Sequence, residues 1–492
     1  NLNERPITQK ANFDSEPINN TIFGINGNFA TEVPFFTRLV NKLPNTDTDV
    51  ASNFSVRGEF AYLAPGAPKG TNFDGEATAY IDDFEGTQGN IDLLSPFAWN
   101  LSSRPLDLGR IYSQGNEDAL GIQNGFDRAL LNWYTIDPIF YGTQRPSGIT
   151  DDDVSNLYTR RVFIREIFPE IDLVQGQQAV INTLDLTYYP SERGPYNFDP
   201  TAANGQALNP NDSWAGITRQ ITSTDFEQAN VEYIEFWVQD PFLDNPTGQG
   251  GKLTINLGNI SEDVLKDGKK QFENGLPEDG NIDFLQNINL QTPYAVPQNQ
   301  SLIYTFGTLG QERINQDVGY DGYDDLEEQD IVAFMSQQTG TALDFGADPS
   351  LDNYAYFLNT EGDIFQRYRS YNGFEGNTPD EFSQTNRGNT TQPDVEDINR
   401  DNTMNTINSY FEYEVDVTPT TLNANNPQIN DVKVAPVTLA NGNTRDVTWY
   451  QFRLPISEPT RAVGGITDIR SVRFARLYLT DFTEQTVMRD RK

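Results

Sequence analysis

FSVRGEFAY, from Phe54 to Tyr62, alternates large apolar residues with small or charged ones. Successive side chains of a β-strand point to opposite faces, so this period of two predicts a strand with one apolar and one polar face. Outer-membrane β-barrel strands have this pattern, with apolar residues facing lipid and polar residues facing a watery lumen. The expected lipid-facing residues are Phe54, Val56, Phe60 and Tyr62, and the expected lumen-facing residues are Ser55, Arg57 and Glu59. A half-buried strand of a soluble sheet has the same periodicity, so both interpretations stay open.

A second segment, Phe23–Phe29, alternates in the same way. Between the two segments, Pro34–Leu43 predicts a short amphipathic helix, because Pro suits the first helical position and Phe36, Leu39 and Val40 fall on one side. We therefore expect residues 1–70 to supply strands of the β-barrel type and one short helix.

The sequence pattern changes from about Gly75 onward, where Asn, Asp, Gly and Pro separate short runs rich in aromatic residues. Ala79–Gly86 predicts the opening strand of a jelly-roll-like sandwich, with Trp99 packed beneath it. Further strands are predicted by alternating or apolar runs at 234–238, 253–257, 450–456 and 472–479. The fold class is therefore mainly β: a sandwich formed by residues 71–265 and 441–492, interrupted by a long, loop-rich insertion at 266–440.

The insertion contains a stretch, Asp317–Glu328, whose spacing resembles an EF-hand-type calcium loop. Its expected oxygen ligands are Asp317, Asp321, the Tyr323 carbonyl, Asp325 and Glu328. Gly322 stands at the sharp turn, whereas Gly319 offers no side-chain oxygen at the third position. A helix is predicted at 326–337, so we expect a calcium-organised turn followed by one helix. An acidic, solvated surface loop is the alternative.

A weaker version of this spacing follows at 397–405. Its expected cation ligands are Asp397, Asn399, Asp401 and Thr403, but Asn408 stands where a bidentate carboxylate belongs. A turn rich in Asx residues is the alternative. Calcium, in a structural role, is the one cofactor that we expect.

Composition restricts the chemistry of the chain. Its 492 residues include neither His nor Cys, so catalytic triads with imidazole, thiolate nucleophiles and Cys-based zinc sites are excluded. The 34 Lys and Arg residues against 71 Asp and Glu residues give a net charge of -37, which disfavours nucleic acid and favours divalent cations as partners. Carboxylate pairs arise easily by chance in such a chain, and we expect no enzyme.

The chain begins at Asn1 rather than Met, and no apolar run approaches the roughly 20 residues of a membrane helix. We expect it to be an internal fragment of a longer protein.

Several ordered stretches resemble the SprA/Sov family, the outer-membrane translocon of the bacterial type IX secretion system. They are residues 31–44, 80–86, 188–197, 214–221, 256–263, 316–322, 397–402 and 469–474. The resemblance extends over nearly the whole chain, and family members are much longer.

The resemblance implies a very large barrel that exports folded proteins across the outer membrane and serves gliding motility in some members. Implied partners are secreted cargo with a C-terminal sorting domain, a PorV-type barrel protein and a periplasmic plug protein. Because extracellular connections of such barrels are long, we expect Gly75 onward to form an extracellular cap or rim, with a periplasmic position as the rival.

Two other functional classes stay open. A calcium-stabilised carbohydrate-binding or adhesive surface module would also explain a sandwich rich in aromatic residues, and a glycan-cleaving enzyme comes third. A sugar-binding platform would need exposed Trp side chains, whereas Trp in a sandwich more often belongs to the core.

Overall fold

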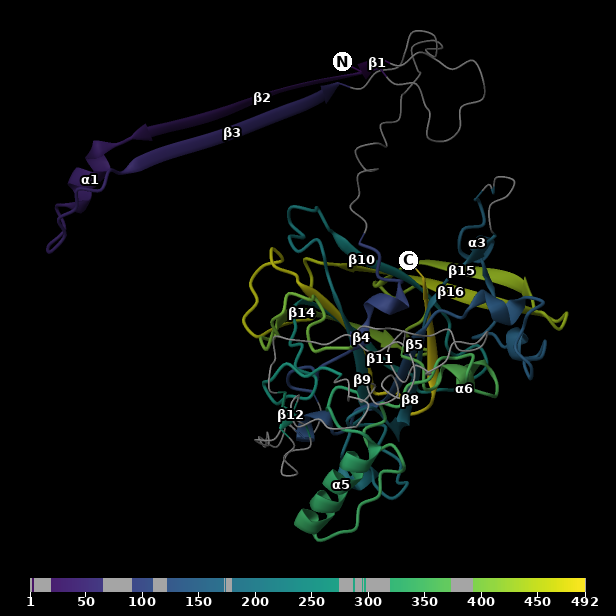
Figure 1. Cartoon of the computed structure of the whole chain (residues 1–492). Helices are drawn as coiled ribbons and strands as arrows, with labels where there is room; N and C mark the ends of the chain where they lie inside the picture. Colours follow the sequence, from purple (N-terminus) through teal and green to yellow (C-terminus); the bar gives the residue numbers. More distant parts are fainter. Residues whose placement is uncertain are drawn as a thin grey trace, which may run out of the picture. The chain divides into compact units, whose positions relative to one another are not determined.

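A computed structural model describes residues 19–64, 91–108, 122–171, 179–273, 319–372 and 393–491, with short stretches at 2–3, 173, 286–287, 294 and 296–297 (Figure 1). The chain divides into two compact units, Asn1–Gln88 and Gly89–Lys492, and each unit is considered by itself.

The first unit is a long antiparallel hairpin. Its elements are β1 (Leu2–Asn3), β2 (Asn19–Glu32), α1 (Pro34–Val40) and β3 (Asn53–Ala64). In the register of β2 and β3, Phe23 lies opposite Tyr62 and Phe29 lies opposite Val56. Directly opposite residues share a face, so these apolar pairs lie together.

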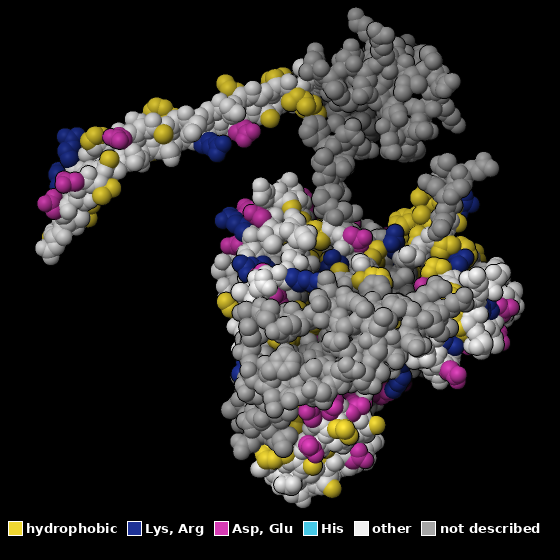
Figure 2. Space-filling view, viewed as in Figure 1, with side chains coloured by type: hydrophobic (Ala, Val, Ile, Leu, Met, Phe, Trp, Pro, Cys, Tyr) yellow, Lys and Arg dark blue, Asp and Glu magenta, His cyan; other side chains and the backbone are white. Residues whose placement is uncertain are grey.

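The other face of the hairpin carries charged and polar residues in its middle. Asn28 pairs with Arg57 and Asn26 pairs with Glu59 on that face. The apolar face is exposed: Ile25 is 72% and Phe60 is 56% accessible, and Figure 2 shows hydrophobic side chains along the hairpin. Which medium each face meets stays a prediction.

The second unit is a sandwich of two antiparallel sheets, each with six strands among the residues described. The first sheet has the order β15 (Ile429–Thr438), β16 (Thr444–Pro455), β10 (Tyr233–Gln239), β19 (Thr486–Arg491), β8 (Leu184–Arg193) and β5 (Ala129–Tyr134). The second has the order β17 (Arg461–Val463), β14 (Ser409–Val417), β11 (Gly251–Asn259), β18 (Phe474–Thr480), β9 (Trp214–Gln220) and β4 (Asn100–Leu101). The predicted mainly β fold is confirmed.

One apolar core joins the two sheets. Val238 and Phe452 from the first sheet pack in the same buried cluster as Ile255, Val415 and Leu479 from the second. The alternating runs predicted from the sequence supply these side chains, because every second residue of each strand points inward. All five Trp side chains of the chain, at positions 99, 133, 214, 237 and 449, are buried. They therefore belong to the interior and form no sugar-binding platform.

The insertion is the connection of a hairpin. β11 and β14 pair along their whole length, and Asn259 at the end of β11 lies opposite Ser409 at the start of β14. The chain therefore leaves the sandwich and returns to it at one point.

The remaining elements are short, except for one helix of the insertion. They are α3 (Ile164–Ile167), α5 (Asp325–Thr339), α6 (Ile364–Tyr368), the strand pair β6 (Val162–Phe163) and β7 (Val180–Ile181), and the pair β12 (Gln286–Asn287) and β13 (Val296–Pro297). No helix in the part of the chain that the structure describes is both long and apolar enough to span a membrane. The predicted opening strand at 79–86 lies outside the described residues.

The C-terminal strand β19 carries buried charge in the middle of its sheet. Arg489 Nε lies 3.1 Å from Asp185 Oδ1 of β8, and its Nη1 donates to the carbonyls of Leu157 and Arg160. Asp490 is also buried, and burial together with the charge of Asp185 raises its pKa to about 8.

We predict that Asp490→Asn stabilises the protein in mildly alkaline solution. An unfolded Asp releases its proton near pH 4, so the unfolded state binds fewer protons than the folded state between about pH 4 and pH 8. This group therefore makes the wild type lose stability as pH rises through that window. Relative to wild type, the variant should gain at least about 1 kcal/mol between pH 5 and pH 8, the equivalent of one pKa unit.

Urea unfolding at the two pH values measures this difference. Asp446→Asn, at an exposed position of β16, is the matched control and should show no such gain. An equal pH response of wild type and Asp490→Asn would contradict the prediction.

Candidate cation site

Helix α5 begins with a complete N-terminal cap. The Asp324 carboxylate accepts hydrogen bonds from the backbone N–H groups of Leu326 and Glu327, both at 3.0 Å, and the Asp324 N–H donates to Glu327. This capping box fixes the first turn, and Gly340 ends the helix in the left-handed conformation, with φ +68°. The sequence prediction placed the helix at 326–337, within two residues of the observed ends.

The buried stripe of α5 starts with a carboxylate. Glu328, Ile331, Val332 and Met335 follow helical spacing, and all four are buried. The apolar members pack in one cluster with Phe198 and other residues. Glu328 is therefore carried into the interior by the same face that anchors the helix.

Three carboxylates meet at this point. One carboxylate oxygen from each of Asp321, Glu328 and Asp352 lies within 4.8 Å of the others. These residues are only 0%, 1% and 7% exposed, respectively. Among the described residues, no Lys or Arg forms an ion pair with any of them.

Neighbouring groups satisfy part of the hydrogen bonding in this cluster. Ser350 donates twice, from its hydroxyl to Asp321 Oδ2 at 2.5 Å and from its N–H to Glu328 Oε2 at 2.9 Å. The Tyr196 hydroxyl hydrogen bonds to Asp352 and accepts from the Tyr320 N–H. Glu328 Oε1 and Asp352 Oδ2 are buried without a hydrogen-bond partner. Two carboxylate oxygens are thus available inside the cluster.

The electrostatics favour a bound cation. Burial raises the pKa of each of the three carboxyl groups, and the charge of the other carboxylates in the cluster raises the pKa of Glu328 and Asp352 further. At neutral pH, either some of these three carboxyl groups stay protonated, or a bound cation neutralises their charge. Hard divalent cations bind through oxygen ligands, and calcium takes six to eight of them, so this arrangement can hold such an ion.

A second set of carboxylates extends the cluster toward the surface. Glu328 belongs also to a group with Asp325 and Asp348, whose oxygens lie within 4.8 Å of one another. Asp325 is exposed and accepts a hydrogen bond from Asn353. Figure 2 shows further acidic side chains around α5.

Two glycines are required by the backbone of this loop. Gly322 has φ +74°, as the sharp turn predicted from the sequence needs. Gly319 also has φ +74°, and a Cβ atom there would lie 1.9 Å from Asp352 Oδ2. The glycine at the third position, which we expected only to lack a ligand, is therefore the residue that lets Asp352 approach.

The predicted loop residues are brought together in part. Asp321 and Glu328 lie in the cluster and Asp325 lies at its edge, whereas Asp317 lies outside the described residues. Tyr323 is fully buried, and its N–H donates to Asp321. That these groups bind calcium stays a prediction.

Three residues of the cluster and its edge were not predicted from the sequence: Asp348, Ser350 and Asp352. These residues come from a later loop, which Arg193 of β8 holds by donating to the carbonyls of Phe345 and Pro349. Tyr196 also donates its N–H to the Ser350 carbonyl at 2.8 Å. The spacing of two acidic residues around Ser350 was visible, but nothing in it indicated the partner loop.

The weaker predicted site forms an Asx-rich turn. Asp397 accepts hydrogen bonds from the N–H groups of Asp401 and Asn402, and Asp401 accepts from the N–H and hydroxyl of Thr403. The Asn399 side chain likewise hydrogen bonds to Asp401. These contacts fit the alternative given above, and cation binding at 397–403 stays an untested prediction.

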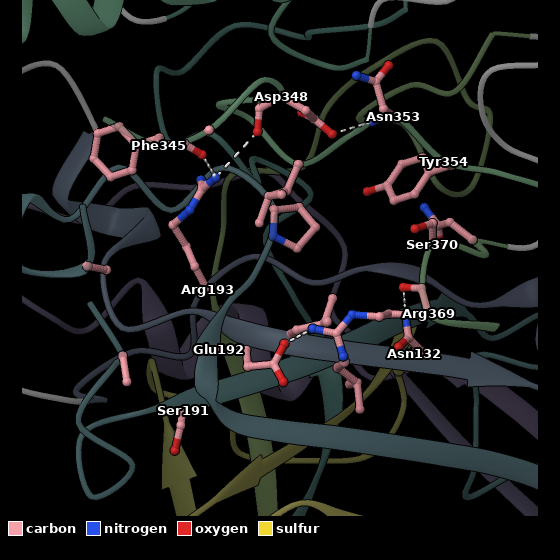
Figure 3. Close-up of a pocket in the computed structure, with 18 of the residues that line it drawn as sticks. Asn132, Ser191, Glu192, Arg193, Phe345, Asp348, Asn353, Tyr354, Arg369 and Ser370 are labelled. Atoms are coloured by element: carbon pink, nitrogen blue, oxygen red, sulfur yellow. Dashed lines mark hydrogen bonds and ion pairs between the residues drawn. The ribbon is translucent and has the colours of Figure 1, made fainter. Parts of the chain in front are cut away.

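A pocket of about 630 Å³ adjoins the candidate cation site and is lined by Asp348, which belongs to its second set of carboxylates (Figure 3). Both arginines that line it are already engaged: Arg193 with loop carbonyls, and Arg369 in an ion pair with Glu192. The Asn132 amide donates to the Arg369 carbonyl at 2.7 Å. The polar groups of this pocket therefore hold the insertion against β8 and the edge strand β5.

Residues 329–491 match the SprA_N family model, described as motility related/secretion protein. The matched range begins directly after Glu328 and runs through α5 to β19. No curated protein matches the chain. The chain thus carries a SprA-family segment, which confirms the resemblance and connects the chain to motility- and secretion-related proteins.

We predict that Glu328→Gln has opposite effects with and without calcium. In chelator the variant should be as stable as wild type or more stable, because it removes a buried carboxylate among others. In calcium it should be less stable by roughly 2 to 3 kcal/mol, the stabilisation that an ion supplies at about 100 times its dissociation constant.

Calorimetric melting curves in calcium and in chelator measure both effects. Asp330→Asn removes the same charge from an exposed position of α5 and should respond to calcium as wild type does. If the wild-type curve ignores millimolar calcium, the cluster holds protons rather than an ion.

Proposed function

We propose that this chain, which carries a SprA-family segment at residues 329–491, is part of a protein-conducting translocon of the bacterial outer membrane. The translocon would export folded proteins in type IX secretion and serve gliding motility. The observation that carries the proposal is the β2–β3 hairpin in the same chain as this segment.

The hairpin has the dimensions and the surface of a membrane β-structure. β2 has 14 residues and β3 has 12, whereas a strand needs about 9 to 11 residues to cross a bilayer. Its apolar side chains are exposed on one face, and Arg57 and Glu59 lie on the other. A soluble hairpin would need another surface to cover this apolar face.

In this proposal, the sandwich and its insertion form an extracellular cap or rim. The connections of outer-membrane proteins are long on the extracellular side, which supports this position. Secreted cargo with a C-terminal sorting domain would pass the cap, and a PorV-type barrel protein and a periplasmic plug protein would be its partners. The chain would act without catalysis, by shaping a passage.

Calcium would have a structural role at Asp321, Glu328 and Asp352. Calcium sites of extracellular modules bind in the range of about 10⁻⁴ to 10⁻³ M, so a weak site outside the cell can be filled. The carbohydrate-binding alternative loses its main support, because the five Trp side chains are in the interior.

The first test concerns the two faces of the hairpin. Phe60→Arg places a charge on the apolar face, at a cost of roughly 2 to 4 kcal/mol if the position lies near the middle of the bilayer. We predict that it lowers the amount of assembled protein in the outer membrane and reduces secretion. Ser55→Arg, on the polar face, is the control and should assemble normally.

Cysteine labelling checks the same assignment directly, since the chain has no native thiol. Water-soluble maleimides should react several-fold faster at positions 55, 57 and 59 than at positions 54, 56, 60 and 62. Equal labelling of both faces in the assembled protein would exclude the membrane assignment.

The second test concerns the position of the sandwich. The turn after α5 is exposed at Thr341, so an epitope inserted there should leave the core intact. We predict that antibodies bind this epitope on intact cells. Binding only after permeabilisation of the outer membrane would show a periplasmic position instead.

A further inference from the structure

A second group of buried carboxylates lies at the base of the insertion. The chain leaves the sandwich after Asn259 and returns at Ser409, so residues 260–273 and 393–408 form the two ends of the insertion. We call these two stretches the outgoing and returning segments.

The two segments are hydrogen bonded to each other. The Glu396 N–H donates to the Gln271 carbonyl and the Glu273 N–H donates to the Asp394 carbonyl, both at 2.9 Å. Phe272 and Val395 form an antiparallel bridge between these contacts. The two ends of the insertion are therefore joined to each other by backbone pairing between residues 271–273 and 394–396.

Carboxylates meet within this base. One oxygen from each of Asp263, Asp267 and Glu396 lies within 4.8 Å of the others. Asp263 and Glu396 are 4% and 1% exposed, respectively. Two of these carboxylates come from the outgoing segment and one comes from the returning segment.

One oxygen in this group is available to a ligand. Asp263 Oδ1 is buried and has no hydrogen-bond partner, while Oδ2 accepts from the Gly268 N–H at 3.2 Å. Glu396 is held in place by the N–H groups of Val264, Leu265 and Gln271. The group is therefore positioned by backbone contacts, with an unsatisfied carboxylate oxygen among the converging side chains.

No ion pair neutralises the charge of these three carboxylates among the described residues. Lys266, Lys269 and Lys270 are close in sequence, yet among the described residues neither they nor any Arg form an ion pair with the three carboxylates. The Lys270 ammonium instead donates to the Asn402 carbonyl. Burial and the charge of Asp267 raise the pKa of Asp263 to about 6, and the charge of Lys266 offsets this only in part.

We propose that Asp263, Asp267 and Glu396 bind a second hard divalent cation, calcium or magnesium, which fastens the two ends of the insertion to each other. Carboxylate oxygens suit both ions, and the ion supplies the positive charge that the cluster lacks. This site is separate from the one at Asp321, because the two share no ligand.

Equilibrium dialysis of the whole chain against calcium chloride or magnesium chloride tests the proposal. With at least one of the two ions, Asp263→Asn should bind one ion per chain fewer than wild type. The control Asp416→Asn, at an exposed position of β14, should bind as many ions as wild type. Glu328→Gln removes a ligand of the other site only. The proposal is overturned if Asp263→Asn, folded by circular dichroism, binds as many ions as wild type in both arms.

Hydrogen exchange keeps the proposal testable if Asp263→Asn does not fold. In the Glu328→Gln variant, we compare amide exchange with and without the ion. At a free ion concentration of about ten times the dissociation constant, the amides of Val264, Leu265 and Gln271 should exchange roughly tenfold more slowly than without the ion. Exchange that is unchanged by either ion would overturn the proposal.

Discussion

The antiparallel pairing of β11 with β14 constrains the rest of the second unit. It places Asn259 opposite Ser409, so the whole insertion must start and finish at the same end of these two neighbouring strands. The strands that follow the insertion complete both sheets: β18 lies between β11 and β9, and β19 lies between β10 and β8. The sandwich is therefore complete only with strands that follow the insertion in sequence. The matched SprA-family range, 329–491, includes all of these strands.

The insertion is organised around carboxylates as well as apolar side chains. Glu328 occupies a core position of α5, and Asp352 reaches it from a loop that Arg193 and Tyr196 hold against the sandwich. Buried like charges oppose folding unless protons or a cation neutralise them. Divalent cations would make the shape of the insertion depend on the medium around it, which suits the extracellular position proposed for this segment.

Much of the sandwich could be predicted from the sequence, because β10, β11 and β16 alternate with a period of two and α5 has caps at both ends. β19 was missed, since its charged residue Arg489 is buried through partners distant in sequence, the Asp185 carboxylate and two backbone carbonyls. Of the candidate cation site, Asp321 and Glu328 followed from the spacing of one loop. Asp348 and Asp352 could not be predicted, because sequence spacing does not show which loop returns to the site.

We expect a cation, rather than protons, to neutralise the carboxylates of Asp321, Glu328 and Asp352. Crystals grown in millimolar calcium at neutral pH, measured at a long wavelength where calcium scatters anomalously, test it most directly. We expect an anomalous peak among these three residues, with carboxylate oxygens at about 2.3 to 2.6 Å from it. The absence of a peak from an ordered cluster would contradict the claim and leave the carboxyl groups protonated.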